Sequence, residues 1–457
     1  MSHRSLAIAL APSLLLALAA CTNSSPHPTP SPSPPDPPAG ATLDQASVPR
    51  DPASSIAPAS LADAVTANNA FALDLYGHVL AAQTAPGNVL TSPVSASLAL
   101  TMAYAGAQGK TATEMATALH YGDPSTIFDG QNALSAALEG RAASALTSAT
   151  ATAKDNEQPA PSASDFALDV VNSVWGEKTY PWAQPFLTTL AKSYGTGVFT
   201  EDFVNQPDPA RLAINGWVSA QTADKINDLI PQGAVDPSTR MVLVNAIHLK
   251  FPWESPFQPA ATADGTFTKD DGSTVTASFM NQGEELPYVD DGKAQIVAIP
   301  LAGGDVSVVI AVPHGDLATY EAGLTSVAIP TQFADVVLSL PKFTFTSASF
   351  SLAKSLQAMG MKQAFDPEAA QFQGMCPNPP DGDNLYVSDV LQKTMIAVQE
   401  TGVEAAAATA VIMAGSSAEQ QTVPVKADKP FVMAIVDGPT GAVLFLGHVE
   451  DPTATGG

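Results

Sequence analysis

The sequence predicts that most of this chain folds as one large α+β domain. From about residue 61 to residue 452, segments with helical spacing of apolar residues alternate with segments typical of strands, and no second linker interrupts them. Hydrophobic residues make up 45% of the chain, which is enough to bury a large core. The two cysteines cannot form a framework of disulfides, so the fold must depend on packing.

Three segments carry the clearest helical signal: residues 61–80, 93–104 and 350–359. In the first of them, apolar side chains recur at the spacing of one helix face, as at Phe71 and Leu75. The sequence therefore predicts helices near the start of the domain and again in its last third.

Several segments are typical of β-strands, because they are rich in apolar and β-branched residues and lie between turn signals. The clearest are residues 241–249, 336–340, 386–398, 431–436 and 442–449. Asp437-Gly438-Pro439-Thr440-Gly441 joins the last two and is a strong hairpin signal. A second hairpin is expected around Gly303-Gly304.

The first 21 residues form a segment of their own. Arg4 supplies a positive charge, residues 5–20 are almost wholly apolar, and the segment ends in Leu18-Ala19-Ala20-Cys21, all of which is typical of an export signal. The ending resembles the lipobox of bacterial lipoproteins, which implies that Cys21 is acylated and becomes the mature N-terminus. An ordinary secretory signal or a short membrane anchor is the alternative. Cys376 then has no partner for a disulfide.

Residues 22–60 are predicted to form a disordered tether. They hold 11 prolines among Ser, Thr and Ala, with almost no aromatic residues, and so bury too little apolar surface to fold. Residues 61–457 then form the folded domain. Within it, residues 143–164 are polar and rich in Ala and Ser, and we expect them to be a mobile surface excursion rather than a domain boundary.

The composition excludes several classes of function. With 19 basic and 44 acidic residues, the net charge of −25 repels nucleic-acid phosphates. The seven histidines have no zinc-ligand spacing, and no nucleophile elbow is present. Gly109-Lys110-Thr111 lacks the first glycine of a phosphate-binding loop, and the Ser351 and Lys354 pair lacks the companion motifs of a serine–lysine enzyme.

The most unusual segment lies near the C-terminus, at residues 400–413. As a strand it places Val403 and the following odd-numbered residues on one face that can be buried, whereas Glu404 starts the opposite face. Its four consecutive alanines have low β-propensity, so a short helix is the alternative. Residues 415–422 are polar and without periodicity, which predicts an exposed loop.

This segment resembles the reactive-loop hinge of the serpins, and the resemblance extends over nearly the whole domain. Motifs similar to those of the family follow in the family's order at residues 88–95, 106–111, 215–218, 222–226, 239–240, 244–247, 253–257, 340–343, 356–361, 427–431 and 447–452. The resemblance implies a serpin fold, with a large central mixed sheet, further sheets, about eight to nine helices and an exposed reactive loop.

The resemblance also implies an inhibitor of serine proteases rather than an enzyme. A protease cuts the exposed loop and forms an acyl-enzyme, and the freed hinge then enters the central sheet as a new strand. Small hinge residues insert with the least steric opposition. The hinge residues are Glu400, Gly402, Val403, Glu404, Ala405, Ala406, Ala407, Ala408 and Thr409.

Family register places the cut bond between Ser416 and Ser417, with Met413 as the fallback. Small residues at the cut suit an elastase-like or subtilisin-like protease, whereas Met413 favours a chymotrypsin-like one. We expect the partner to be such a protease, and the protein to be a monomer that needs no cofactor or metal and reaches a membrane only through its lipid anchor.

Two positions depart from the family pattern. Val403 stands where Thr or Ser is usual, and Gln392 stands where many serpins have a histidine beneath the sheet opening. Because glutamine both donates and accepts hydrogen bonds, it can form a network with nearby polar side chains. The predicted residues of this sheet-opening region are Ser92, Ser95, Asn215, Trp253 and Gln392.

Three alternatives to this function stay open. A non-inhibitory serpin that acts as a binding protein would share the fold, although its hinge usually carries bulky, charged or proline residues. An inhibitor of cysteine proteases would use the same loop. A tethered hydrolase would need a catalytic motif that this sequence does not assemble. In each case we expect an exported protein outside the cytoplasm, either lipid-anchored to a bacterial membrane or extracellular.

Overall fold

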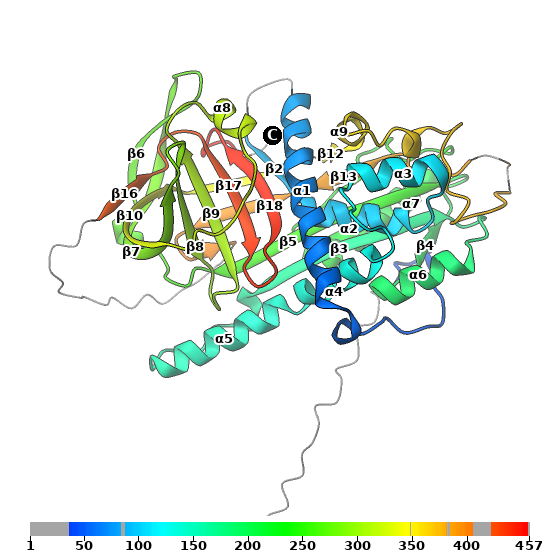
Figure 1. The fold of residues 1–457 in the computed structure, drawn as a ribbon, viewed down its shortest axis with the longest axis horizontal. Helices are drawn as coiled ribbons and strands as arrows, with labels where there is room; N and C mark the ends of the chain where they lie inside the picture. Colours follow the sequence, from blue (N-terminus) through cyan, green and yellow to red (C-terminus); the bar gives the residue numbers. More distant parts are fainter. Residues whose placement is uncertain are drawn as a thin grey trace, which may run out of the picture. The chain divides into compact units, whose positions relative to one another are not determined.

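Two nine-stranded β-sheets and nine α-helices form the part of the chain that the computed structural model describes (Figure 1). That part comprises residues 36–83, 87–347, 349–380, 382, 384–404 and 422–455. The arrangement confirms the predicted α+β fold, its large central mixed sheet and its expected number of helices.

The central sheet has the strand order β1, β4, β3, β5, β15, β14, β11, with β12 and β13 attached beside this path. It is mixed, because β3 with β4 and β5 with β13 pair in parallel, whereas its other pairs are antiparallel. Its strands are β1 (Thr42–Asp44), β3 (Ala167–Glu177), β4 (Val198–Glu201), β5 (Met241–Pro252), β11 (Phe343–Thr346), β12 (Phe350–Ser351), β13 (Val390–Lys393), β14 (Met395–Gln399) and β15 (Gly402–Val403).

The second sheet has the order β16, β10, β7, β8, β9, β17, β18, β2, with β6 paired to β7. Both predicted hairpins lie in it, one between β17 and β18 and one between β8 and β9. Its strands are β2 (Val89–Thr91), β6 (Ala263–Thr268), β7 (Thr274–Asp290), β8 (Ala294–Pro300), β9 (Val306–Pro313), β10 (Phe333–Pro341), β16 (Val423–Lys426), β17 (Phe431–Asp437) and β18 (Ala442–Val449).

The helices cover the sheets, except for α2, which lies in the core. Every α2 residue but Tyr104 is buried, and the helix contacts β3 and β5 of the central sheet and β18 of the second sheet. The helices are α1 (Pro58–Ala82), α2 (Pro93–Tyr104), α3 (Gly109–Ala118), α4 (Ile127–Glu139), α5 (Arg141–Asp155), α6 (Gln184–Tyr194), α7 (Pro207–Gln221), α8 (Leu317–Ala322) and α9 (Ala353–Ala358). Short 3-10 turns are η1 (Ala53–Ser55), η2 (Ala163–Asp165), η3 (Pro259–Ala261) and η4 (Gln363–Phe365).

Most predicted elements are confirmed, and two have different boundaries. The predicted helix at residues 350–359 begins as strand β12, and only residues 353–358 are α-helical. The predicted strand at 386–398 is divided into β13 and β14 at Thr394. The backbone N–H of Thr394 donates to Ser347 Oγ at 2.9 Å, and its hydroxyl donates to Leu90 O at 3.1 Å, so tertiary contacts break the strand there.

The folded domain begins earlier than residue 61, so the predicted extent of the tether is wrong for residues 42–60. β1 pairs with β4, and the Arg50 side chain, which is 5% exposed, forms an ion pair with Glu139 at 2.8 Å and donates to Asn132 Oδ1 at 2.7 Å. The prolines of the predicted tether are concentrated in residues 26–38, and residues 41–51 contain only Pro49. That leaves enough backbone donors for strand pairing. Residues 22–35 lie outside the described residues.

Most of the predicted excursion at residues 143–164 is helix α5 rather than an irregular loop. Its alanines are strong helix formers, and Arg141 at its first turn is bound at 2.6 Å to the buried Asp437 and at 3.0 Å to Asp305. Leu146 and Ala149 pack against the core of the second sheet. The helix is therefore anchored at its start and along one side.

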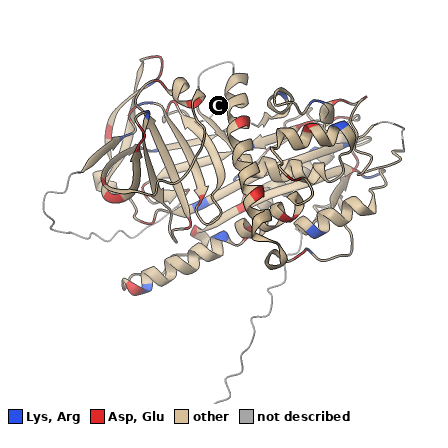
Figure 2. Ribbon diagram, in the orientation of Figure 1, with Lys and Arg blue, Asp and Glu red and all other residues tan. Residues whose placement is uncertain are grey.

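Figure 2 shows Asp and Glu distributed over helices, strands and loops of the described residues, with fewer Lys and Arg between them. No helix within the described ranges is long and apolar enough to cross a lipid bilayer.

Candidate functional site

β15 places two residues of the hinge inside the central sheet. Val403 pairs with Phe251 of β5 on one side and with Val398 of β14 on the other. Its side chain is 1% exposed and belongs to the same hydrophobic core as both partners. At these positions the hinge is a strand and not a helix. Gly402 has a φ of 156°, a value that favours glycine.

Three hydrogen bonds hold the turn that leads from β14 into β15. Trp253 donates its backbone N–H to Thr401 O at 3.1 Å and its indole N–H to Gln399 O at 2.7 Å. The backbone N–H of Phe257 donates to Glu400 O at 2.9 Å. Trp253 therefore lies at the point where the hinge enters the sheet, and it fixes the turn through both backbone and side chain.

The Glu400 side chain, at the start of the hinge, binds residues of two other segments. It forms an ion pair with Lys342 at 2.9 Å and accepts a hydrogen bond from the Thr262 hydroxyl at 3.0 Å. Burial favours the neutral acid, but the interactions with Lys342 and Thr262 outweigh it and hold the pKa of Glu400 below its usual value. The carboxylate is therefore charged at neutral pH and ties the hinge to the segment before β11.

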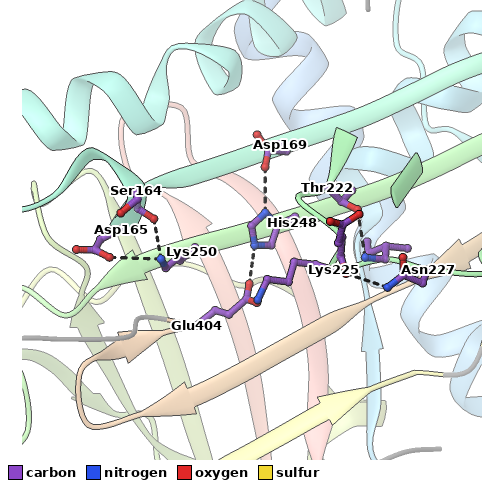
Figure 3. A network of polar contacts seen from close by, with 11 residues as sticks. Ser164, Asp165, Asp169, Thr222, Lys225, Asn227, His248, Lys250 and Glu404 are labelled. Atoms are coloured by element: carbon purple, nitrogen blue, oxygen red, sulfur yellow. Dashed lines mark hydrogen bonds and ion pairs between the residues drawn. The ribbon is translucent and has the colours of Figure 1, made fainter. Parts of the chain in front are cut away.

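Glu404 follows the last residue of β15 and belongs to a cluster of charged side chains (Figure 3). Its φ of 55° is left-handed, and its backbone N–H still donates to Ala397 O at 2.7 Å. Its carboxylate lies 2.5 Å from His248 Nε2 and 2.6 Å from Lys225 Nζ. His248 Nδ1 lies 3.0 Å from Asp169 on β3, so the imidazole bridges two carboxylates.

These contacts shift both titrating groups toward their charged forms. Burial disfavours the charged imidazole, but hydrogen bonds to Asp169 and Glu404 outweigh burial and raise the pKa of His248 to about 9. Burial likewise disfavours the Glu404 carboxylate, yet His248 and Lys225 hold its pKa below the usual value. At neutral pH the cluster therefore consists of a cationic imidazole and an ammonium group around one carboxylate, with Asp169 beyond them.

The central sheet has an opening directly below the hinge. On the side of β5 that faces β14, residues 251–252 pair with β15 and residues 243–246 pair with β13. Within the described residues, no strand pairs with β5 on that side along residues 247–250. A strand that continued β15 would therefore lie beside backbone groups of β5 that no described strand pairs with on that side.

A buried polar network lies below this opening. The Gln392 side chain, which is 0% exposed, donates to Ser92 O at 2.9 Å and to Asn245 Oδ1 at 2.8 Å, and it accepts from the Ser92 N–H at 3.0 Å. Ser95 Oγ lies 3.0 Å from the side-chain amide of Asn172. The network holds the end of β2, the start of α2 and strands β3, β5 and β13 together.

Asn215 does not join this network. It lies on α7, where its side chain donates to Ile230 O at 2.9 Å and accepts from the Ile230 N–H at 2.8 Å. It therefore anchors the segment between α7 and β5. Sequence reasoning missed Asn245, which takes the place expected for Asn215, and also missed His248 and Lys225. The signal for His248 was a titratable residue inside an otherwise apolar strand.

Other predicted site residues lie outside the described residues. They are Cys21, Ala405, Ala406, Ala407, Ala408, Thr409, Met413, Ser416 and Ser417. In the ranges that are described, no group of His, Cys, Asp or Glu side chains is arranged to hold a metal ion.

Comparison with known proteins identifies the family. The family model described as "Serpin (serine protease inhibitor)" matches residues 66–452. Leukocyte elastase inhibitor A of Mus musculus is 32% identical over 406 residues, which cover 85% of this chain and 99% of that protein. The thermophilic serpin tengpin in its native state has a TM-score of 0.73 at 26% identity, over 90% of this chain and 99% of tengpin. Human thyroxine-binding globulin, solved with bound thyroxine, has a TM-score of 0.72 at 27% identity, over 86% of this chain and 100% of that structure.

This chain belongs to the serpin family. Its relatives include an elastase inhibitor, as the name of the mouse protein states, and a thyroxine-binding protein. The fold is therefore compatible with more than one activity, and the choice between them depends on the hinge.

Proposed function

We propose that this protein is a suicide-substrate inhibitor of serine proteases. The observation that carries the proposal is the position of Gly402 and Val403 between β5 and β14, directly above an opening in the sheet. Once the loop is cut beyond the hinge, the hinge residues after Val403 can extend strand β15 between β5 and β14. The similarity to leukocyte elastase inhibitors supports the same function.

The mechanism follows from ordinary acyl transfer and strand addition. The serine of the protease attacks the carbonyl carbon of the residue before the cut, the new amine leaves, and an acyl-enzyme remains. The hinge then inserts and carries the attached protease with it. About ten new backbone hydrogen bonds, each contributing about 1 kcal/mol, would drive the movement, together with burial of apolar hinge side chains.

The sequence of the hinge suits this step. Residues 405–408 are alanines, so neither bulk nor charge opposes passage between the two strands. We propose Ser416–Ser417 as the cut bond, with Met413 as the alternative position. An elastase-like or subtilisin-like protease fits the first site and a chymotrypsin-like protease the second.

The test is incubation of the protein with elastase, subtilisin and chymotrypsin, followed by a denaturing gel. A complex that resists denaturation supports inhibition, and the mass of the small C-terminal fragment released with it identifies the cut bond. Cleavage without such a complex, by all three proteases, would refute the proposal and favour a binding role like that of thyroxine-binding globulin. Parallel incubation with papain tests inhibition of cysteine proteases.

We further propose that the protein is exported and held at a bacterial membrane by acyl chains on Cys21. The lipobox-like ending of the first 21 residues supports this proposal. Expression of the full chain with labelled palmitate should give a labelled, membrane-associated protein, and Cys21→Ser should abolish both label and association. Labelling that survives in this variant would contradict the assignment.

A further inference from the structure

We propose that the ion pairs of Glu404 with His248 and Lys225, here called the Glu404 lock, stop the uncut loop from entering the sheet beyond Val403. The lock would preserve the native form until a protease cuts the loop. Its biological purpose rests on the proposed inhibitory function, whereas its effect on insertion does not.

The backbone alone does not explain why the hinge stops at Val403. Gly402 lies opposite Pro252 and Val403 opposite Phe251, so a continued strand would place Glu404 opposite Lys250. Within the described residues no strand pairs with β5 at that position on the side that faces β14, and the Glu404 N–H already donates to Ala397 O of β14. Glu404 instead has a left-handed φ and is not part of strand β15. A side-chain interaction must therefore favour the turn.

The Glu404 carboxylate provides that interaction. The side chain is 9% exposed and lies between the imidazole of His248 and the ammonium of Lys225 (Figure 3). Removing the carboxylate from both partners loses two charge-assisted contacts, and hydration of the freed carboxylate offsets that loss only in part. Rotation of the backbone into an extended strand would carry the carboxylate away from this site.

The partners cannot follow Glu404 into the sheet, because both belong to anchored segments. His248 lies on β5 and is also bound to Asp169 on β3. Lys225 lies between α7 and β5, and that segment is anchored at two other points: Asn215 holds Ile230, and Lys393 on β13 donates to Asn227 O at 2.6 Å. Insertion of residue 404 therefore moves its carboxylate relative to both partners and toward Lys250, the residue opposite on β5.

The charged groups around His248 determine how the lock responds to pH. Asp169 faces it from β3, Glu404 from the hinge and Lys225 from the α7–β5 segment, while Lys250 on the same strand is bound to Asp165 of η2 at 3.3 Å. Because the pKa of His248 is raised to about 9, the imidazolium contact is fully present below about pH 6.5 and is lost as the pH rises through about 9. The lock therefore weakens at alkaline pH.

The test measures spontaneous insertion in the absence of any protease. Intact protein is incubated at elevated temperature, and urea-gradient gels then measure the fraction that has converted to an uncut form that resists unfolding in urea. Glu404→Gln and Lys225→Met should convert at least about tenfold faster than the unmodified protein, as expected for loss of a charge-assisted hydrogen bond. Lys178→Met, which removes an exposed ion pair with Asp202 remote from the hinge, is the matched control and should not change the rate.

A pH series separates the lock from a general loss of stability. Conversion of the unmodified protein should accelerate between about pH 8 and pH 10, and His248→Gln should be fast throughout and lose that dependence. Unchanged rates in Glu404→Gln and Lys225→Met, or a complete absence of conversion in every variant, would overturn the proposal. A protein that converts as described but forms no complex with proteases would leave the lock intact and refute only the inhibitory function.

Discussion

The Gln392 side-chain amide and the backbone of Ser92 form a closed pair of hydrogen bonds, one in each direction, at 2.9 and 3.0 Å. Both groups are completely buried, and the remaining amide hydrogen of Gln392 is used by Asn245. The residue that departs from the family pattern thus satisfies three buried polar groups on two other segments.

Replacement of Gln392 by Leu should therefore destabilise the native protein strongly. The substitution leaves the Ser92 N–H and Asn245 Oδ1 without these partners, whereas Ser92 O keeps its bond from the Ala96 N–H; each unsatisfied buried group costs about 1–3 kcal/mol. The urea concentration at which the native form unfolds should fall. Gln158→Leu, at an exposed position, is the control for the change in side-chain character. An unfolding midpoint unchanged in Gln392→Leu would show that the network contributes little.

Charge or proline in the hinge should turn the inhibitor into a substrate. Val403 faces the core, so a continued strand places residues 405 and 407 on the same buried face. Ala405→Pro removes a strand donor and Ala407→Arg buries a charge, and either change slows insertion until hydrolysis of the acyl-enzyme is faster. Ala407→Ser is the control of similar size. A denaturation-resistant complex formed by the proline or arginine variant as efficiently as by the unmodified protein would disprove this account of the hinge.

The ion pair between Lys342 and Glu400 should stabilise the top of the sheet in a pH-dependent way. Because the pKa of Glu400 is depressed in the folded protein, its contribution is present above the usual pKa of a glutamate and is lost as the pH falls through the depressed value. Lys342→Met should lower the urea midpoint at about pH 7, with a smaller difference from the unmodified protein at about pH 4. Equal differences at the two pH values would mean that the lysine acts through packing of its aliphatic chain.

The accuracy of the sequence predictions depended on whether the determining contacts were local. The hairpin at residues 431–449 was predictable because two apolar runs flank five consecutive residues that are typical of a turn. Gly441, the last of these five, has the left-handed φ of 77° that such a turn needs. The burial of Val403 on one face of a strand was similarly predictable, because successive side chains of a strand point to opposite faces. The division of β13 from β14 was not, because it depends on contacts of Thr394 with Ser347 and Leu90, far away in the sequence.

The polar groups of the site show the same limit. His248 and Glu404 are 156 positions apart, and no local pattern in either segment indicates that they meet. Asn215 and Asn245 both fall in family-like motifs, and only the register of β5 with β13 places Asn245 opposite Gln392. The resemblance could locate the opening in the sheet, whereas the partners across it had to come from the three-dimensional structure.

The early start of the folded domain leads to a prediction about Arg50. Its side chain is almost fully buried and carries three kinds of contact, with the carboxylate of Glu139, the side chain of Asn132 and the backbone O of Asn132. Arg50→Ala removes the cation from the Glu139 carboxylate, which keeps only its hydrogen bond from the Ser135 hydroxyl, and it removes the donor to Asn132 Oδ1; we expect a loss of about 2–4 kcal/mol in the free energy of unfolding. Arg50→Lys should recover only part of the loss, because a single ammonium cannot reproduce the fork of the guanidinium. Removal of residues 22–35, which the structure does not describe, serves as the control and should leave the urea midpoint unchanged. An unfolding midpoint unchanged in Arg50→Ala would show that the contacts of Arg50 with α4 contribute no stability to the domain.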